Sequence, residues 1–299
     1  MSVVCIAAQF SFTKAYQKKY VAGLLSALAF QAIVAPAGAA FLICANGFKL
    51  SVSAFSTAMA LAMAAINVSS ALAGIYAIKF GMLSVYTTFM MLGGMTLPFA
   101  YGVAALSERP TAAQAAGLFV LVVSLFLPFA GRRNDNARGE RPGAFILLCA
   151  AVFALNGCVS VLSKAHQIDA RAADTLSFMI LTNAFSSVFS AAAITAYLLG
   201  RKGDKNAAPK PIRGSILTVR SAKQAGLAAA VSVIGCSGYM LQLFAAKNMP
   251  ATALYPMVTG GTIVMTSAAG RVFFGERIPW RLRAGIALSI VGTFMISFR

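Results

Sequence analysis

Four polar side chains stand at helical spacing in and just after the apolar segment 142–163. They are Asn156, Ser160, Ser163 and Lys164, and their spacing of i, i+4, i+7 and i+8 places them on one face of a helix. An unsatisfied polar group in hydrocarbon costs several kcal/mol, so each of these groups needs a hydrogen-bonding partner or water. Because lysine is rare at such depth, this face is a candidate for binding a polar solute.

Polar groups in other apolar segments extend this set. The segment 52–78 carries two of them at i, i+3, the segment 223–246 carries two at the same spacing, and the first and seventh segments add Gln9 and Asn183. The candidate substrate-binding residues are Asn67, Ser70, Asn156, Ser160, Lys164, Tyr239 and Gln242. Such residues also hydrogen-bond one helix to another in membrane proteins, and this alternative stays open for each of them.

The composition indicates which environment these segments occupy. The chain has 299 residues, of which 59% are hydrophobic and only 11% charged, and its mean hydropathy is +0.79. A soluble domain carries about 25% charged residues. The apolar residues come in blocks of the length that a bilayer-spanning helix needs, roughly 20 residues. The sequence therefore predicts an all-α polytopic membrane protein in contact with the lipid bilayer.

The basic and sulfur-containing residues fit this class. The net charge is +18, but the Lys and Arg residues fall almost wholly in short connections between apolar segments, where the positive-inside rule places them, and not in a patch for nucleic acid. Their bias toward alternate connections predicts that the loops 131–143 and 201–223 are cytoplasmic and both termini outside. The five cysteines all lie in apolar segments without metal-ligand spacing, so we expect neither a metal site nor a disulfide framework.

Turn residues and charges divide the chain into ten spans. They cover approximately 1–14, 20–46, 52–78, 81–106, 111–131, 142–163, 173–200, 223–246, 250–274 and 279–298. The predicted domains are a five-helix unit at 1–131, a linker at 132–141, and a second five-helix unit at 142–299 that contains the basic loop 201–223.

Two short stretches indicate that the second unit is a copy of the first. SERPTAAQAAG (107–117) and GERIPWRLRAG (275–285) each carry Glu-Arg, then Ala-Gly, then an apolar run. Near the start of each unit, FTKAYQ (12–17) matches LSKAHQ (162–167). A unit with an odd number of spans ends on the side opposite to its beginning, so its copy must be inverted. Inverted repeats are typical of secondary transporters that work by alternating access, with the substrate site near the midplane.

The two paired stretches, together with ALYPMVTGGTIVMTSAAGRVFFGE (253–276), resemble the drug/metabolite transporter superfamily and its EamA-type members. The resemblance covers the whole chain and implies a fold of ten transmembrane helices in two inverted repeats. It also implies export of amino acids or drugs, or movement of sugars, nucleotide sugars or other metabolites. Typical members are thought to have both termini inside, which differs from the orientation that the charge bias predicts here.

The charged residues near span ends leave two questions open. Lys14 and Lys164 hold equivalent positions in the two units, where each either extends to the membrane interface or gives the cavity a positive field. Glu108 and Glu276 are expected to pair with the neighbouring Arg109 and Arg277. All seven acids lie at or near span ends, so coupling to protons through a mid-span carboxylate is not expected. A uniporter, or coupling through Lys164 or His166, remains open, although His166 is expected in a solvated loop.

The predicted function is carrier-mediated movement of a small polar metabolite, an amino acid or a similar compound, most commonly by export. The alternatives are a multidrug exporter and, from another class, a membrane-embedded enzyme that acts on lipid. The sequence offers no catalytic pattern and no nucleotide loop, so we expect a non-enzyme without cofactors. The expected partners are the solute and the lipid bilayer, in a bacterial inner or plasma membrane, and monomer or homodimer is left open.

Overall fold

The computed structural model describes residues 1–20, 24–80, 83–127, 142–203, 222–275 and 280–297. These described residues form ten α-helices and no strand. The helices are α1 (Ser2–Tyr20), α2 (Leu24–Ala45), α3 (Ala54–Phe80), α4 (Leu83–Ala105), α5 (Ala112–Phe126), α6 (Pro142–Ile168), α7 (Thr175–Gly203), α8 (Ala222–Asn248), α9 (Ala251–Phe274) and α10 (Trp280–Ser297). The predicted linker 132–141 and most of the predicted loop 201–223 lie outside the described residues.

The ten predicted spans correspond one to one with these helices. The clearest differences are at α1 and α6, which continue past the predicted ends at 14 and 163. Both extensions, AYQKKY and KAHQI, are polar but contain good helix formers. Hydropathy therefore marked the end of the apolar length and not the end of the helix.

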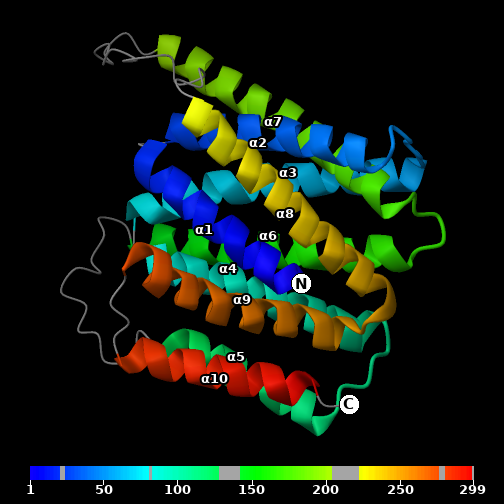
Figure 1. Cartoon of the computed structure of the whole chain (residues 1–299), viewed down its shortest axis with the longest axis vertical. Coiled ribbons are helices and arrows are strands. Elements are labelled where there is room, and N and C mark those ends of the chain that lie inside the picture. The colour runs from blue at the N-terminus through cyan, green and yellow to red at the C-terminus, as the bar shows by residue number, and fades with distance from the viewer. Residues whose placement is uncertain (21–23, 81–82, 128–141, 204–221, 276–279, 298–299) are drawn as a thin grey trace.

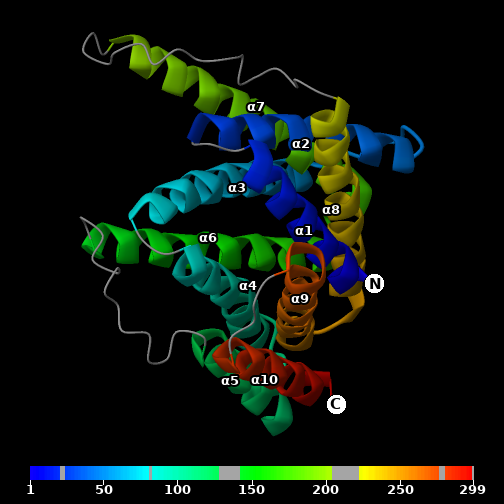
Figure 2. The same ribbon diagram turned by 60° about the vertical axis from the view of Figure 1, so that its left-hand side comes forward.

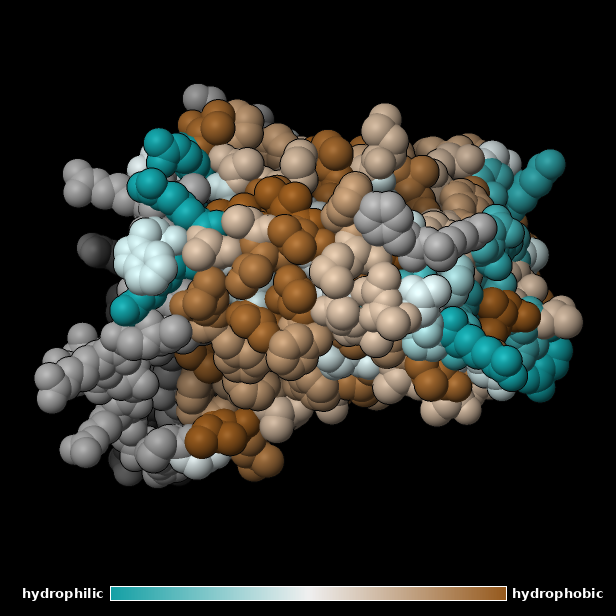
Figure 3. Space-filling model, turned by 90° about the horizontal axis from the view of Figure 1, so that it is seen from below, coloured by the Kyte–Doolittle hydropathy of each residue, from teal (hydrophilic) through white to brown (hydrophobic). Residues whose placement is uncertain are grey.

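The surface of the helix bundle is that of a membrane-embedded protein. Six of the described helices are long and apolar enough to cross a membrane, namely α2, α3, α4, α6, α7 and α8. The surface in Figure 3 has a broad hydrophobic band between hydrophilic residues near its two ends. Large apolar side chains such as Phe119, Leu147, Val188 and Phe294 are exposed, as side chains facing lipid are.

The helices are stacked along the longest axis of the molecule (Figures 1 and 2). α2 and α7 pack together at one extreme, and α5 and α10 pack together at the other. The connections α2–α3, α4–α5, α6–α7 and α8–α9 all lie on the right in Figure 1. We call this side, formed by residues 46–53, 106–111, 169–174 and 249–250, the α8–α9 end, and the side where α1, α3, α7 and α9 finish the opposite end.

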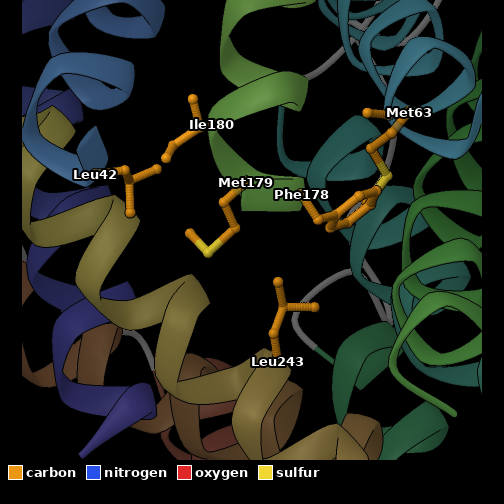
Figure 4. Packing of buried hydrophobic residues seen from close by; sticks show 7 residues of the cluster. Leu42, Met63, Phe178, Met179, Ile180 and Leu243 are labelled. Carbon is orange, nitrogen blue, oxygen red and sulfur yellow. The ribbon is translucent and has the colours of Figure 1, made fainter. Parts of the chain in front are cut away.

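A buried apolar cluster joins helices that are distant in the sequence. Leu42 of α2, Met63 of α3, three residues of α7 and Leu243 of α8 meet in it (Figure 4). The three residues from α7 are Phe178, Met179 and Ile180. Since this cluster ties helices of the first half to helices of the second, the two halves form one body around the centre of the bundle.

Candidate functional site

A cavity of about 560 Å³ lies among eight helices, α1 to α4 and α6 to α9. Its lining residues come mostly from the middle parts of these helices. Asn67, for example, is near the centre of α3, and Asn156 is near the centre of α6. The cavity is therefore at mid-depth in the apolar length of the bundle.

Five of the seven predicted substrate-binding residues line this cavity. They are Asn67, Asn156, Ser160, Tyr239 and Gln242. Ser70 and Lys164 are not among the lining residues. The helical face predicted for α6 thus points into the cavity at Asn156, Ser160 and Ser163, and its last member lies beyond the cavity toward the α8–α9 end.

Further polar residues line the cavity that are not among the seven predicted substrate-binding residues, although Gln9, Ser163 and Asn183 were noted in the sequence. They are Gln9, Gln31, Ser163, Thr182, Asn183, Ser186, Ser232, Tyr255, Thr259 and Thr262. The signal that selected Asn67, an amide in an otherwise apolar segment, is equally present at Gln31. Hydroxyl groups carry less signal, because Ser and Thr are common in membrane helices, where they bond to the preceding turn.

Hydrogen bonds among these residues tie the lining helices together. The amide nitrogen of Asn156 donates to the carbonyl oxygen of Met90 over 2.7 Å, which joins α6 to α4. The hydroxyl groups of Ser163 and Tyr239 are 2.6 Å apart, which joins α6 to α8. These lining residues therefore hydrogen-bond one helix to another, the alternative that the sequence left open, and they also face the cavity.

Other lining groups have no hydrogen-bond partner. The structure gives none to the side chains of Gln9, Gln31, Asn67 and Gln242 within the described part of the chain. The hydroxyl groups of Tyr255 and Thr262 are buried and also have no partner there. Buried polar groups in proteins are nearly always paired, so this set is available to water or to a bound solute.

The lining carries no formal charge. None of the residues that line the cavity is Asp, Glu, Lys, Arg or His. Within the described ranges there is also no group of three or more His, Cys, Asp and Glu side chains that could hold a metal ion. The cavity is thus suited to hydrogen bonding with a polar solute that has no net charge.

Two charged residues lie instead around the α8–α9 turn. The ammonium group of Lys164 donates to the carbonyl oxygens of Ala246 and Met249, over 2.7 and 2.8 Å, at the C-terminus of α8. Lys164 is buried, so it does not extend to the interface. Cations stabilise helix C-termini, where the last carbonyl groups lack intrahelical partners.

Glu108 holds the other side of the same turn. Its carboxylate accepts hydrogen bonds from the backbone N–H groups of Ala251 and Thr252, over 2.7 and 2.9 Å, and from the Thr252 hydroxyl over 2.8 Å. These are the first amide groups of α9, where a helix favours an anion. The sequence predicted that Glu108 pairs with its neighbour Arg109, whereas its carboxylate hydrogen-bonds to Ala251 and Thr252. The other predicted pair, Glu276 with Arg277, lies outside the described residues.

The loop before α5 positions Glu108. Ser107 has a φ of 54°, which turns the chain sharply after α4. Thr111 then caps α5: its hydroxyl accepts from the N–H of Gln114, and the Gln114 side chain accepts from the N–H of Thr111. This capping box fixes the start of α5 and leaves Glu108 facing α9.

His166 is buried and not in a solvated loop as expected, because α6 continues to Ile168. Its ring nitrogen Nε2 is 2.8 Å from the Ser56 hydroxyl of α3, and Gln167 contacts its Nδ1 at 3.1 Å. The ring stacks on Phe178 of α7, with centroids 3.8 Å apart. His166 thus joins α3, α6 and α7 near the α8–α9 end, outside the cavity lining.

Further contacts join the two halves at this end. Ser51 and Asp174 hydrogen-bond through their side chains, and the N–H of Ser51 donates to the Ser177 hydroxyl over 2.9 Å. Partial burial raises the pKa of Asp174, but the hydrogen bonds from Ser51 and Ser177 outweigh this effect and leave the pKa below its ordinary value of 3.8. The pKa of Asp169 is lowered to about 2 by its hydrogen bonds with Arg171, a contact within the same loop.

Comparison with known proteins informs the fold. Neither a family model nor a curated protein matches the sequence. Solved structures do match, 28 chains in all. One of them, described as "Crystal structure of protein", has a TM-score of 0.72 at 14% identity, and the match covers 99% of this chain and 96% of that one. At this identity the likeness concerns the fold alone, over its full length.

Proposed function

We propose that this protein is a secondary transporter, and not an enzyme, that moves a small polar metabolite across the membrane by alternating access. The observation that carries the proposal is the uncharged, hydrogen-bonding cavity at mid-depth among eight helices, six of which are long and apolar enough to cross a membrane. Such a cavity gives a polar solute partners where the lipid offers none. The solute class that fits is an amino acid or a similar compound, because a lone ion would lack a counter-charge there.

The packing of the helices supports the inverted repeat on which alternating access depends. Replacing each helix by the one five places away converts the contact of α1 with α8 into that of α6 with α3. It also converts α4 with α6 into α9 with α1, and α3 with α7 into α8 with α2. The pairs α2–α7, α4–α9 and α5–α10 convert into themselves, as they would across a pseudo-two-fold axis.

The sequence pattern supplies the rest of the proposal. The resemblance of residues 107–117 and 275–285 to the EamA-type members of the drug/metabolite transporter superfamily suggests export as the direction. By the positive-inside rule, the basic connections favour an orientation with the opposite end in the cytoplasm and the α8–α9 end outside. The proposed location is a bacterial inner or plasma membrane. The similarity of the fold to solved structures is compatible with a transporter but does not itself indicate a function.

The test is solute flux with purified protein in liposomes. Counterflow of radiolabelled amino acids should depend on the protein, and Asn156→Leu should reduce it strongly, because Asn156 both lines the cavity and joins α6 to α4. Asn248→Leu, at the exposed end of α8, is the matched control and should keep full flux. Proof of correct insertion is required for both variants.

A second experiment separates this proposal from drug export. Metabolites inside and outside cells are compared with and without the gene, together with the sensitivity of both strains to cationic dyes. Redistribution of a small polar metabolite supports the proposal. If no metabolite redistributes and the knockout becomes sensitive to dyes, the protein is a multidrug exporter. If the purified protein in detergent forms a product from lipid, it is a membrane-embedded enzyme.

A further inference from the structure

The carboxamide side chains of this protein are distributed unusually. Every Asn and Gln that the described helices carry more than one turn from a helix end lines the cavity. These residues are Gln9, Gln31, Asn67, Asn156, Asn183 and Gln242. They come one each from α1, α2, α3, α6, α7 and α8, which are the first three helices of each five-helix unit. Carboxamides that only joined helices would also occur at helix contacts away from the cavity, as they commonly do in membrane bundles.

Neighbouring glycines provide space for some of these carboxamides. A β-carbon added at Gly235 of α8 would lie 2.6 Å from Cδ of Gln9, and one added at Gly94 of α4 would lie 2.6 Å from Nδ2 of Asn156. A third, at Gly38 of α2, would lie 3.2 Å from Oδ1 of Asn183. Three carboxamides are thus held against the backbone of an adjacent helix, where the absence of a side chain leaves room for them.

The hydrogen-bonding capacity of the cavity is both donating and accepting. A carboxamide has two N–H donors and one carbonyl acceptor. Asn156 and Asn183 each use one N–H on a backbone carbonyl and keep their other groups, while the other four have no partner among the described residues. The hydroxyl groups of Tyr255 and Thr262, whose residues are 2% and 4% exposed, line the same space without a partner.

We propose that this cavity binds an uncharged solute with a carboxamide-type edge, on which an N–H donor and a C=O acceptor lie side by side. This inference rests on the proposed transport function and, among small polar metabolites, favours an uncharged amide over a zwitterionic amino acid. Of the two kinds of solute without net charge, the zwitterion needs two buried charges to be stabilised, and the lining has no charge to offer either of them. An amide edge needs only matched donors and acceptors, which this lining supplies. A site built from unpaired polar groups rejects analogues that leave those groups unsatisfied.

The experiment measures binding to the purified full-length protein by thermal stabilisation, which needs no flux. The probes are nicotinamide, an uncharged carboxamide; nicotinate, the same ring as a carboxylate anion; glutamine, a zwitterion that carries a carboxamide; and phenylalanine, a zwitterion without one. We expect stabilisation by nicotinamide with an apparent affinity about tenfold or more above that of the other three. Stabilisation by a zwitterion or by nicotinate that equals or exceeds it, or no stabilisation by nicotinamide at all, overturns the inference.

A pair of glycine variants on α8 tests the role of the carboxamides. Gly235→Ala displaces the Gln9 carboxamide without deleting it and should weaken nicotinamide binding about tenfold, the usual effect of one misplaced hydrogen-bonding group. Gly226→Ala, where an added β-carbon meets nothing within 4 Å, should leave binding unchanged. Equal affinity of the two variants for nicotinamide would mean that the Gln9 carboxamide does not contribute to binding, and it would overturn the role assigned to Gln9 and Gly235.

The outcomes separate this inference from the proposed function. Nicotinamide binding without protein-dependent flux of any solute keeps the carboxamide site and refutes the transporter. Protein-dependent flux of amino acids without nicotinamide binding keeps the transporter and refutes the carboxamide edge.

Discussion

The two ends of the helix bundle differ in how equivalent helices meet. At the α8–α9 end, α6 packs on α8, and Ser163 and Tyr239 hydrogen-bond across that contact. The counterparts of this pair under the proposed repeat, α1 and α3, make no comparable contact among the described residues. Lys164 is buried on the carbonyl groups that finish α8, whereas the equivalent Lys14 is exposed and lies 5.1 Å from the centroid of the Phe274 ring.

Under the proposed repeat, this difference means that the two five-helix units hold two different conformations, with the α6–α8 pair in contact and the α1–α3 pair without a comparable contact in the described part of the chain. In the proposed transport cycle the two units exchange these conformations, so that the α1–α3 pair closes while the α6–α8 pair separates. Several contacts at the α8–α9 end must then break or move together, among them Ser51 with Asp174 and Ser51 with Ser177.

The largest effect is expected from locking that end. Ser51→Cys and Ser177→Cys are introduced together in a background without the five native cysteines, and a short thiol-specific crosslinker joins them. The backbone nitrogen of Ser51 is 2.9 Å from the Ser177 hydroxyl oxygen, so the two positions are close enough to be joined. Ser177 is fully buried, so the reagent should reach it when this end opens, and the crosslink should then abolish solute flux. Counterflow in liposomes before and after cleavage of the crosslinker is the measurement.

Each single-cysteine variant, treated in the same way, serves as the control and should keep its flux. Full flux in the crosslinked double variant would mean that this end does not open, and the comparison of the two ends would lose its functional meaning.

The next effect concerns Glu108, the acceptor at the start of α9. Glu108→Ala removes three hydrogen bonds to Ala251 and Thr252 and also removes an anion that interacts with the buried Lys164. We expect a loss of about 3 kcal/mol in the free energy of unfolding, since bonds to a charged group contribute about 1.5–3 kcal/mol. Unfolding by denaturant in detergent gives the value.

Glu108→Gln keeps one acceptor in place and should cost clearly less than Glu108→Ala. If Ala and Gln have the same small effect, Glu108 does not hold the turn.

The two equivalent lysines provide the direct test of the comparison. Lys164→Met should destabilise the protein by about 2 kcal/mol, because two buried carbonyl oxygens lose a charged donor. Lys14→Met should change stability by less than about 1 kcal/mol, because Lys14 is exposed and the contacts of exposed charges contribute little. Both free energies come from unfolding of the purified variants, and similar losses would show that the two ends are equivalent after all.

The sequence predicted the helices well because length and hydropathy are local properties. It predicted five cavity residues for a related reason: amides such as Asn67 and Asn156 are expensive in apolar helices wherever these pack. It could not predict what lies opposite a given face. Lys164 shares the helical face of Asn156, yet it contacts the end of α8, and the partners of Glu108 are more than 140 residues away in the chain. Similarly, His166 follows the last apolar residues of its segment, and only the packing of α3 and α7 on it accounts for its burial.

The smallest effect is expected from acid, and it distinguishes contacts between the halves from contacts within a loop. The folded-state pKa of Asp174 is below its ordinary value of 3.8, so its carboxylate stabilises the fold above that pH, and this contribution is lost as the pH falls through the lower, folded-state pKa. Asp169, with a pKa of about 2, also stabilises the fold except in acid, but its partner Arg171 is in the same loop.

Thermal unfolding in detergent is followed from neutral pH into the acid range for Asp174→Asn, Asp169→Asn, and each of these combined with Ser51→Ala. The effects of Asp174→Asn and Ser51→Ala should be less than additive at neutral pH and additive in acid, because only the ionised Asp174 accepts the Ser51 hydrogen bond in full. The effects of Asp169→Asn and Ser51→Ala should be additive at every pH. Additivity for both pairs at neutral pH would mean that Asp174 does not couple the two halves, and the closed state of the α8–α9 end would then depend on Glu108 and Lys164.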